Sequence, residues 1–185
     1  MSEYIIRPAS EADFPALARL WEEVFGDGPA FTDEFFRVMW TPGCCRLAEQ
    51  DGALAAMGFC LTGPTARGLR CGYIYSMATF PRHRGHGLAA QIGRSLVSDA
   101  FAAGLDIVAT LPAEESLNAW YATRLGMRGV FKKGGDGVLF PDNWQRFARF
   151  CGAHDPSTPD VLLATARDGV TLEPFMGLGW EITLD

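Results

Sequence analysis

Arg82-His83-Arg84-Gly85-His86-Gly87-Leu88 is the stretch that decides how this 185-residue chain is organised. It follows a β-like run, Cys71–Phe80, and a proline, and it opens a run with helical spacing, Leu88–Ala102. Two glycines one residue apart let the backbone approach a ligand closely and adopt conformations that other residues avoid. At the start of a helix, exposed N–H groups and the helix dipole both favour an anion. The stretch therefore predicts a phosphate-binding loop between a strand and a helix.

The distribution of charge supports this prediction. The chain has 22 Asp and Glu against 16 Lys and Arg, a formal net charge of −6, yet no acidic residue lies between Gly52 and Ser98. A local positive field of this kind attracts phosphorylated ligands. The alternative interpretation is a short basic turn that only begins a helix. The acid-free segment contains the basic residues Arg67, Arg70, Arg82, His83, Arg84, His86 and Arg94.

Length and composition favour one globular domain over residues 1–185. Hydrophobic residues make up 48% of the chain, and no apolar run reaches the roughly 18–20 residues of a membrane span. The N-terminus has no secretory signal pattern, so we expect a cytoplasmic protein. The five cysteines are an odd number without metal-ligand spacing, which argues against a disulfide scaffold and gives no reason to expect a metal site.

Hydrophobic periodicity predicts the order β-α-α-β-β-β-α-β-α-β over residues 4–132. A capping box, Ser10–Asp13, begins the first helix, and turn residues at Gly63-Pro64-Thr65 separate two strands. The expected strands are Tyr4–Arg7, Cys44–Glu49, Ala53–Thr62, Arg70–Phe80, Leu105–Leu111 and Met127–Lys132. The first expected helix ends at Phe25, and the second begins at Thr32 or Asp33 and ends at Trp40. The third spans Leu88–Ala102, and the fourth spans Leu117–Leu125 with Ser116 as its cap.

The tail from about residue 133 is less regular, and we expect it to pack on the same domain. Pro141–Phe150 predicts a helix with its proline in the first turn. Val161–Arg167 and Thr171–Glu173 flank Asp168-Gly169, which predicts a tight hairpin. A last strand is expected within Phe175–Leu184.

The glycine loop resembles the Q/R-x-x-G-x-G/A signature of the GCN5-related N-acetyltransferases. Arg82 stands at the first position, and Gly85 and Gly87 stand at the two glycine positions. The resemblance implies an α/β fold, a mixed, mostly antiparallel twisted sheet with helices on both faces. It also implies that the loop binds the pyrophosphate of acetyl-coenzyme A. The cofactor-binding residues implied in the loop are Arg82, His83, Arg84, Gly85, His86, Gly87 and Leu88.

Three further groups of candidate residues follow from the same resemblance. Met77, Ala78 and Thr79, at the end of the preceding strand, would bind the pantetheine arm and the acetyl carbonyl through main-chain atoms. Asn118 would contact the cofactor arm. Tyr121 would act as the general acid that protonates the departing thiolate, since a phenol of pKa about 10 suits a thiolate of pKa about 8.5.

Tyr121 departs from the family pattern in its spacing. It precedes Gly126 by five residues, whereas the family tyrosine precedes that glycine by four, where this chain has Ala122. One residue rotates a helical side chain by about 100°. Tyr121 therefore has two open interpretations, a general acid or a half-buried packing residue.

The acceptor side is less defined. Tyr73 and Tyr75 alternate onto one face with Met77 in a regular strand, and are expected to line the acceptor site or to pack in the sheet. Glu114 could bind the amine through water or serve as a solvated residue at a helix start. The strand before the loop has no glutamate to act as a general base.

The sequence thus predicts an acetyl-CoA-dependent N-acetyltransferase that acetylates a primary amine of a small molecule or peptide by direct attack. The alternatives are a non-catalytic acyl-CoA-binding or sensing domain of the same fold and an enzyme that transfers a longer acyl group. We expect no nucleic-acid partner, because the basic residues gather in one loop of an acidic chain. No membrane partner is expected, and a homodimer is left open.

Overall fold

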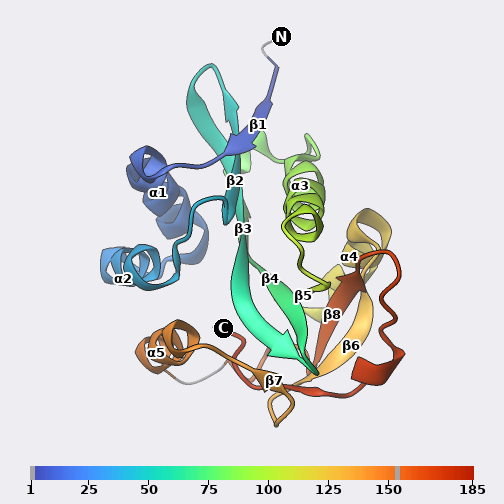
Figure 1. The fold of residues 1–185 in the computed structure, drawn as a ribbon. Coiled ribbons are helices and arrows are strands. Elements are labelled where there is room, and N and C mark those ends of the chain that lie inside the picture. The colour runs from blue at the N-terminus through green and yellow to red at the C-terminus, as the bar shows by residue number, and fades with distance from the viewer. Residues whose placement is uncertain (1–2, 153–154) are drawn as a thin grey trace. The chain divides into compact units, whose positions relative to one another are not determined.

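The computed structural model describes residues 3–152 and 155–185 (Figure 1). They group into two compact units. Among the described residues, unit 1 comprises 3–61 and 74–96, and unit 2 comprises 62–73, 97–152 and 155–185. Strands β3 (Ala53–Ala66) and β4 (Leu69–Thr79) and helix α3 (Leu88–Ala102) each contribute residues to both units.

Unit 1 is built on an antiparallel ladder. Strand β1 pairs with β2, where Ile5 lies opposite Glu49, and β2 pairs with β3, where Cys45 lies opposite Phe59. Figure 1 shows α1 and α2 on one face of these strands and the start of α3 on the opposite face. The remaining elements of unit 1 are β1 (Ile5–Pro8), α1 (Phe14–Phe25), α2 (Pro29–Met39), β2 (Cys45–Gln50) and the 3-10 turns η1 (Glu11–Asp13) and η2 (Pro81–His83).

Two local signals in the sequence position α1. The expected capping box forms, because the backbone N–H of Ser10 donates to Asp13 Oδ2 at 2.8 Å. Asp13 also accepts from Arg7, which in turn bonds Glu49 on the neighbouring strand. The helix ends at Phe25, as the sequence predicts, and Gly26 follows it in the left-handed conformation.

An aromatic cluster fills the core of unit 1 between the helices α1 and α2 and the sheet. Trp21 lies 4.8 Å from Phe35 and 5.7 Å from Phe59, measured between ring centroids. Tyr75 from β4 joins them at 5.9 Å from Trp21. Rings of this size bury much apolar surface, so this cluster fixes both helices on the strands.

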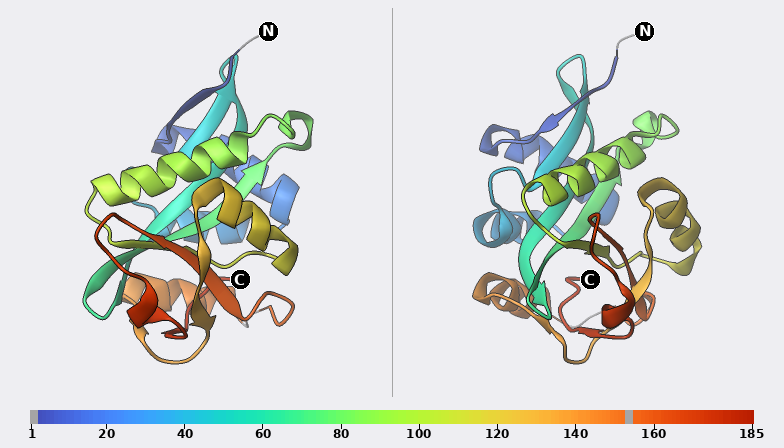
Figure 2. Two further views of the ribbon diagram at one scale, coloured as in Figure 1. Left: turned by 90° about the vertical axis from the view of Figure 1, so that its right-hand side faces the viewer. Right: turned by 45° about the vertical axis from the view of Figure 1, so that its right-hand side comes forward.

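In unit 2 the tail supplies a central strand. β8 (Val161–Ala166) pairs antiparallel with both β5 (Ile107–Thr110) and β6 (Arg128–Lys133). Figure 2 shows β8 lying between these two strands. The other elements are α4 (Asn118–Leu125), β7 (Val138–Leu139), α5 (Asp142–Cys151), β9 (Gly179–Trp180) and the 3-10 turns η3 (Glu115–Leu117) and η4 (Glu173–Phe175).

Tryptophans hold the core of unit 2. Trp144 and Trp180 are fully buried, and both lie against Tyr73 at ring-centroid distances of 5.7 and 5.6 Å. Trp144 Nε1 donates to the carbonyl oxygen of Thr62 at 2.9 Å, so its polar atom is satisfied. The tail helix α5 is therefore part of this core, since Trp144 lies on it.

The strand order confirms the expected fold class. Over the described residues, the nine strands follow the hydrogen-bonded order β1-β2-β3-β4-β5-β8-β6-β9, with β7 paired to β3. Only the β4–β5 and β6–β9 pairings have a parallel register among those described. The order of helices and strands up to β6 also matches the sequence prediction.

Several predicted boundaries are wrong. α2 begins at Pro29 rather than near Thr32, because proline suits the first turn of a helix. Gly63-Pro64-Thr65 continues β3 instead of turning the chain. Ser116 lies inside a 3-10 turn and does not cap α4, and Pro141 precedes α5 rather than starting it.

The expected hairpin around Asp168-Gly169 does not form. β8 ends at Ala166, and the residues that should form the returning strand lead into the 3-10 turn at Glu173. The last strand is shorter than expected, since β9 contains only Gly179 and Trp180. These residues are bounded by glycines and prolines, which favour turns over long strands.

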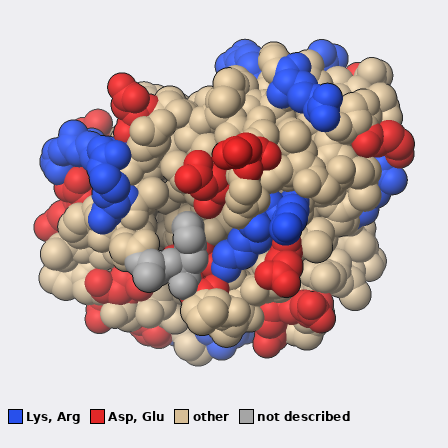
Figure 3. Space-filling model, turned by 90° about the horizontal axis from the view of Figure 1, so that it is seen from below, with Lys and Arg blue, Asp and Glu red and all other residues tan. Residues whose placement is uncertain are grey.

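The helices and surface add two observations. Among the described residues, no helix combines the length and the apolar character that a membrane span requires. On the face seen in Figure 3, acidic and basic side chains are interspersed, so that face has no large block of one sign.

Candidate functional site

The glycine loop adopts a conformation that requires its two glycines. Gly85 and Gly87 have φ values of +83° and +72°, in the left-handed region that other residues rarely adopt. A Cβ at either position would meet nothing within 4 Å. The glycines are therefore explained by backbone conformation rather than by crowding, and the space beside them is open to a ligand.

The start of α3 presents backbone donors beside the loop. The first bond of this helix runs from Gln91 N–H to the carbonyl oxygen of Gly87, at 3.1 Å. The N–H groups of Leu88, Ala89 and Ala90 precede it and have no intrahelical acceptor. Together with the positive end of the helix dipole, they form an arrangement that favours an anion.

The basic side chains of the loop are held by unit 1 itself. Arg82 lies over the ring of Phe80 at 4.4 Å from its centroid, and Arg84 Nε donates to the carbonyl oxygen of Thr79 at 3.3 Å. Within the loop His83 is half-buried and Leu88 is buried, while the other residues are exposed. Burial and the neighbouring charges of Arg82 and His86 lower the pKa of His83.

Tyr4 holds the two histidines of the loop. Its hydroxyl lies 3.0 Å from His83 Nδ1, and its ring centroid lies 5.3 Å from that of His86. No motif in the sequence identified Tyr4, because the contact spans 79 residues. An aromatic residue just before a first strand carries no local signal of this role.

Arg70 belongs to a different group from the loop. In unit 2 its guanidinium donates to the carbonyl oxygens of Ala103 and Gly104, at 3.4 Å each, where α3 ends. Its backbone N–H donates to Asp106, which also pairs with Arg167 at 2.8 Å. The expectation that all basic residues of the acid-free segment form one field is therefore wrong for Arg70.

A backbone irregularity changes the faces of β4. Ser76 has a φ of +49°, which breaks the alternation of side chains along a strand. Tyr75 packs on Trp21, on the side of α1, while Met77 reaches the position that a Cβ on Gly58 would occupy, beside Ile92 of α3. The expectation that Tyr75 and Met77 share one face is wrong for this reason.

Asn118 and Tyr121 lie on α4 in unit 2. Asn118 Oδ1 is buried and has no hydrogen-bond partner among the described residues. Tyr121 is 8% exposed, and its hydroxyl hydrogen-bonds to Thr110 at the end of β5. Burial raises the pKa of Tyr121, and the bond to Thr110 partly offsets this rise. An unpaired buried acceptor is costly, so Asn118 indicates a missing donor.

The candidates for the acceptor side differ in accessibility. Tyr73 is 2% exposed, and its hydroxyl donates to the carbonyl oxygen of Thr183 at 2.7 Å in unit 2. Tyr75 is half-buried in unit 1. Glu114 is exposed and accepts a 2.6 Å hydrogen bond from Ser116, at the start of a 3-10 turn.

No group of three His, Cys, Asp or Glu residues among those described could hold a metal ion.

The family follows from a comparison of the sequence with protein-family models. The model described as "Acetyltransferase (GNAT) domain" matches residues 5–121. The chain belongs to this acetyltransferase family. The match includes β4, the glycine loop, α3 and Tyr121, and it leaves the tail that supplies β8 outside the matched residues. No curated protein sequence matches the chain.

Solved structures share the fold at low sequence identity. A GNAT family N-acetyltransferase (YhbS) from Escherichia coli in complex with CoA has a TM-score of 0.69 and 16% identity, over 98% of this chain and 91% of that one. N-acetylglutamate synthase from Neisseria gonorrhoeae, complexed with coenzyme A and N-acetyl-glutamate, has a TM-score of 0.59 and 18% identity, over 90% and 35%. A Trypanosoma brucei acetyltransferase has a TM-score of 0.57 and 18% identity, over 68% of this chain and 93% of that one.

Proposed function

We propose that this protein is an acetyl-CoA-dependent N-acetyltransferase that transfers an acetyl group to a primary amine of a small molecule or peptide by direct attack. The observation that carries the proposal is the loop from Arg82 to Leu88. Its two left-handed glycines and the free N–H groups of α3 form an anion-binding arrangement in a chain of this family. Two of the similar structures contain CoA, which agrees with a pyrophosphate as that anion.

Other residues of the chain fit the pantetheine arm and the acetyl group of acetyl-CoA. The buried, unpaired Asn118 Oδ1 can accept a hydrogen bond from an amide N–H of the pantetheine arm. Among the described residues, the parallel pairing of β4 with β5 ends at Tyr73, so backbone groups of Met77, Ala78 and Thr79 are not used by that pairing. These groups can bind the arm and polarise the acetyl carbonyl, the kind of contribution worth about 3 kcal/mol in a transition state.

Acetyl-CoA supplies an activated thioester, and the chain supplies binding and proton transfer. In direct attack, the amine nitrogen forms a bond to the acetyl carbon, the carbon–sulfur bond breaks, and the amine loses a proton to solvent or a base. Tyr121 is the candidate that donates a proton to the sulfur. A phenol is protonated at neutral pH, as an acid requires, and burial raises the pKa of Tyr121 further.

The structure reduces the set of residues that we propose to line the acceptor site. Tyr75, half-buried beside Trp21, is retained as a residue that lines the acceptor site. Tyr73 is not retained, because its hydroxyl is bonded to Thr183 in a buried core. Glu114 is exposed and remains a candidate for water-mediated contact with an amine.

The test measures CoA binding and turnover separately. Gly85→Trp should abolish CoA binding measured by calorimetry, because the bulk fills the open space of the loop. Gly52→Trp is the matched control, since Gly52 also has a positive φ of +76° and open space, but lies in the turn between β2 and β3. Equal binding by the two variants would exclude the loop as the pyrophosphate site.

Tyr121→Phe then distinguishes an enzyme from a non-catalytic acyl-CoA-binding domain. With panels of amine, peptide and aminoglycoside acceptors, free thiol release should fall at least tenfold while CoA affinity stays within about twofold. Unchanged turnover would remove Tyr121 as the acid. Absence of turnover in the wild-type protein with every acceptor, together with tight CoA binding, would favour the binding domain.

A further inference from the structure

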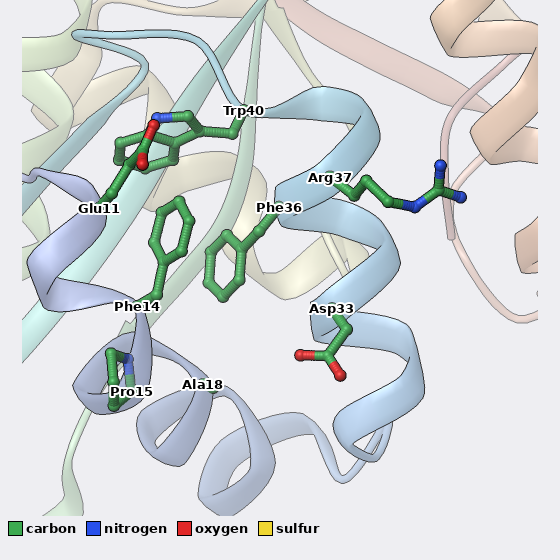
Figure 4. A pocket seen from close by; sticks show the side chains of 8 residues that line it. All are labelled: Glu11, Phe14, Pro15, Ala18, Asp33, Phe36, Arg37 and Trp40. Atoms are coloured by element: carbon green, nitrogen blue, oxygen red, sulfur yellow. The ribbon is translucent and has the colours of Figure 1, made fainter.

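A cavity lies within unit 1, between the start of α1 and the end of α2. It has a volume of about 460 Å³, within the range of roughly 300–1,000 Å³ of small-molecule pockets. It shares no residue with the loop, with β4 or with the candidates on α4. Figure 4 shows its lining residues, which are Glu11, Phe14, Pro15, Ala18, Asp33, Phe36, Arg37 and Trp40.

Three aromatic rings form one side of this cavity. Phe14 of α1 and Phe36 of α2 are stacked with their centroids 4.2 Å apart and an interplanar angle of 5°. Trp40 stands nearly perpendicular to both rings, at 84° to Phe14 and 80° to Phe36. All three side chains are half-buried. They present π-electron density that favours a cation over a neutral or anionic ligand.

Two carboxylates add negative charge to the same cavity. Glu11 and Asp33 are exposed, and among the described residues neither forms an ion pair. The neighbouring cation does not neutralise Asp33, because Arg37 donates through Nε to Glu34 at 2.9 Å. Figure 4 shows Asp33 pointing into the space between the helices and Arg37 extending away from the ring pair.

We propose that this cavity binds a small organic cation, a quaternary ammonium group with an apolar body. The rings accept the methyl groups and the spread positive charge, and the carboxylates of Glu11 and Asp33 supply the counter-charge. A bare metal ion fits poorly, because most of the lining is carbon and the two carboxylates belong to different elements. The proposal is independent of acetyl transfer, since a quaternary nitrogen has no N–H to acetylate.

The test uses choline and its neutral isostere, 3,3-dimethyl-1-butanol, at constant ionic strength. Proton NMR should show an upfield shift of the choline N-methyl signal, since these protons lie over aromatic rings. Calorimetry should give an affinity for choline at least about threefold higher than for the isostere, the discrimination expected of a cation–π site that is open to solvent. Equal affinities, or no detectable choline binding at 50 mM (about the upper limit for a usable site), would overturn the proposal.

Variants locate the site. Glu11→Gln and Asp33→Asn should each weaken choline binding about threefold or more, and Trp40→Leu should remove the upfield shift. Glu23→Gln is the matched control, because Glu23 is exposed on α1 but does not line the cavity. Circular dichroism checks that each variant is folded. A loss of affinity in Glu23→Gln equal to that in Asp33→Asn would show general charge attraction and overturn the site.

Discussion

The hydroxyl of Tyr4 lies 3.0 Å from Nδ1 of His83, which connects the beginning of the chain to the glycine loop. The same tyrosine ring packs against His86, on the other side of Gly85. Apart from His83 and the buried Leu88, the loop residues are exposed, and the two glycines have open space around them. Tyr4 is therefore one of the contacts that limit the conformations of the loop within unit 1, together with those that Arg82 and Arg84 make with Phe80 and Thr79.

The first prediction concerns pH. The lowered pKa of His83 means that the folded protein binds this proton less tightly than the unfolded chain, whose histidine titrates near pH 6.5. A bound pyrophosphate favours the protonated ring, so CoA affinity should rise as the pH falls from about 7.5 to 5.5. Calorimetry across this range measures the slope, and His83→Gln should reduce it. An equal slope in this variant would contradict the role of His83.

The second prediction concerns acid stability. Hydrogen bonds from Arg7 lower the pKa of Asp13 to about 2, below its ordinary value of 3.8. A carboxyl group with a lowered pKa stabilises the fold above the ordinary pKa and loses this contribution as the pH falls through the lowered one. The wild-type protein should therefore lose stability between about pH 5 and pH 2. Urea unfolding of Asp13→Asn should show a flatter dependence on pH in this window.

The third prediction concerns a pair in unit 2. Lys133 Nζ lies 2.6 Å from Asp185 Oδ2, and both side chains are nearly buried, with exposed fractions of 14% and 11%. Lys133→Met should destabilise the protein by about 3 kcal/mol in urea unfolding, because it removes the charged partner of a nearly buried carboxylate. The matched control is Lys132→Met, an exposed neighbour that should change stability by less than about 0.5 kcal/mol. Similar losses in both variants would show that the pair contributes little.

The fourth prediction concerns Gly58. A Cβ there would lie 2.2 Å from Met77 Sδ and 2.9 Å from Ile92 Cγ2. Gly58→Ala should destabilise the protein by about 1–2 kcal/mol through overpacking. Adding Met77→Ala should recover part of this loss, which a double-mutant cycle of thermal unfolding measures. Purely additive effects would mean that Met77 does not occupy this space.

The order of the elements could be predicted from the sequence because it rests on short-range signals. The predicted bounds of α3, Leu88 to Ala102, are confirmed, since a loop with two glycines precedes an uninterrupted helical stripe. The capping box at Ser10 and the end of the first helix at Phe25 are also confirmed. The tail was predicted less well, because its short strands depend on partners far away in the sequence.

The faces of β4 could not be predicted for a related reason. Tyr73, Tyr75 and Met77 alternate in the sequence, but Ser76 adopts a positive φ that no residue type at that position announces. The contact of Tyr4 with His83 and the bond of Tyr121 to Thr110 also join segments that only folding brings together. The spacing of Tyr121 from Gly126 left its role open between a general acid and a packing residue, and it did not predict the partner of the Tyr121 hydroxyl.

The sequence by itself determined the family, the fold class and the strand–loop–helix arrangement around the two glycines, because glycine conformation, helix starts and hydrophobic periodicity are properties of neighbouring residues. Only the tertiary structure decided that β8 from the tail pairs with both β5 and β6, that Tyr73 is committed to a buried core, and that Phe14, Phe36 and Trp40 share one cavity. These outcomes depend on burial and hydrogen bonding between distant segments, where the free energy of packing rather than local preference selects the arrangement.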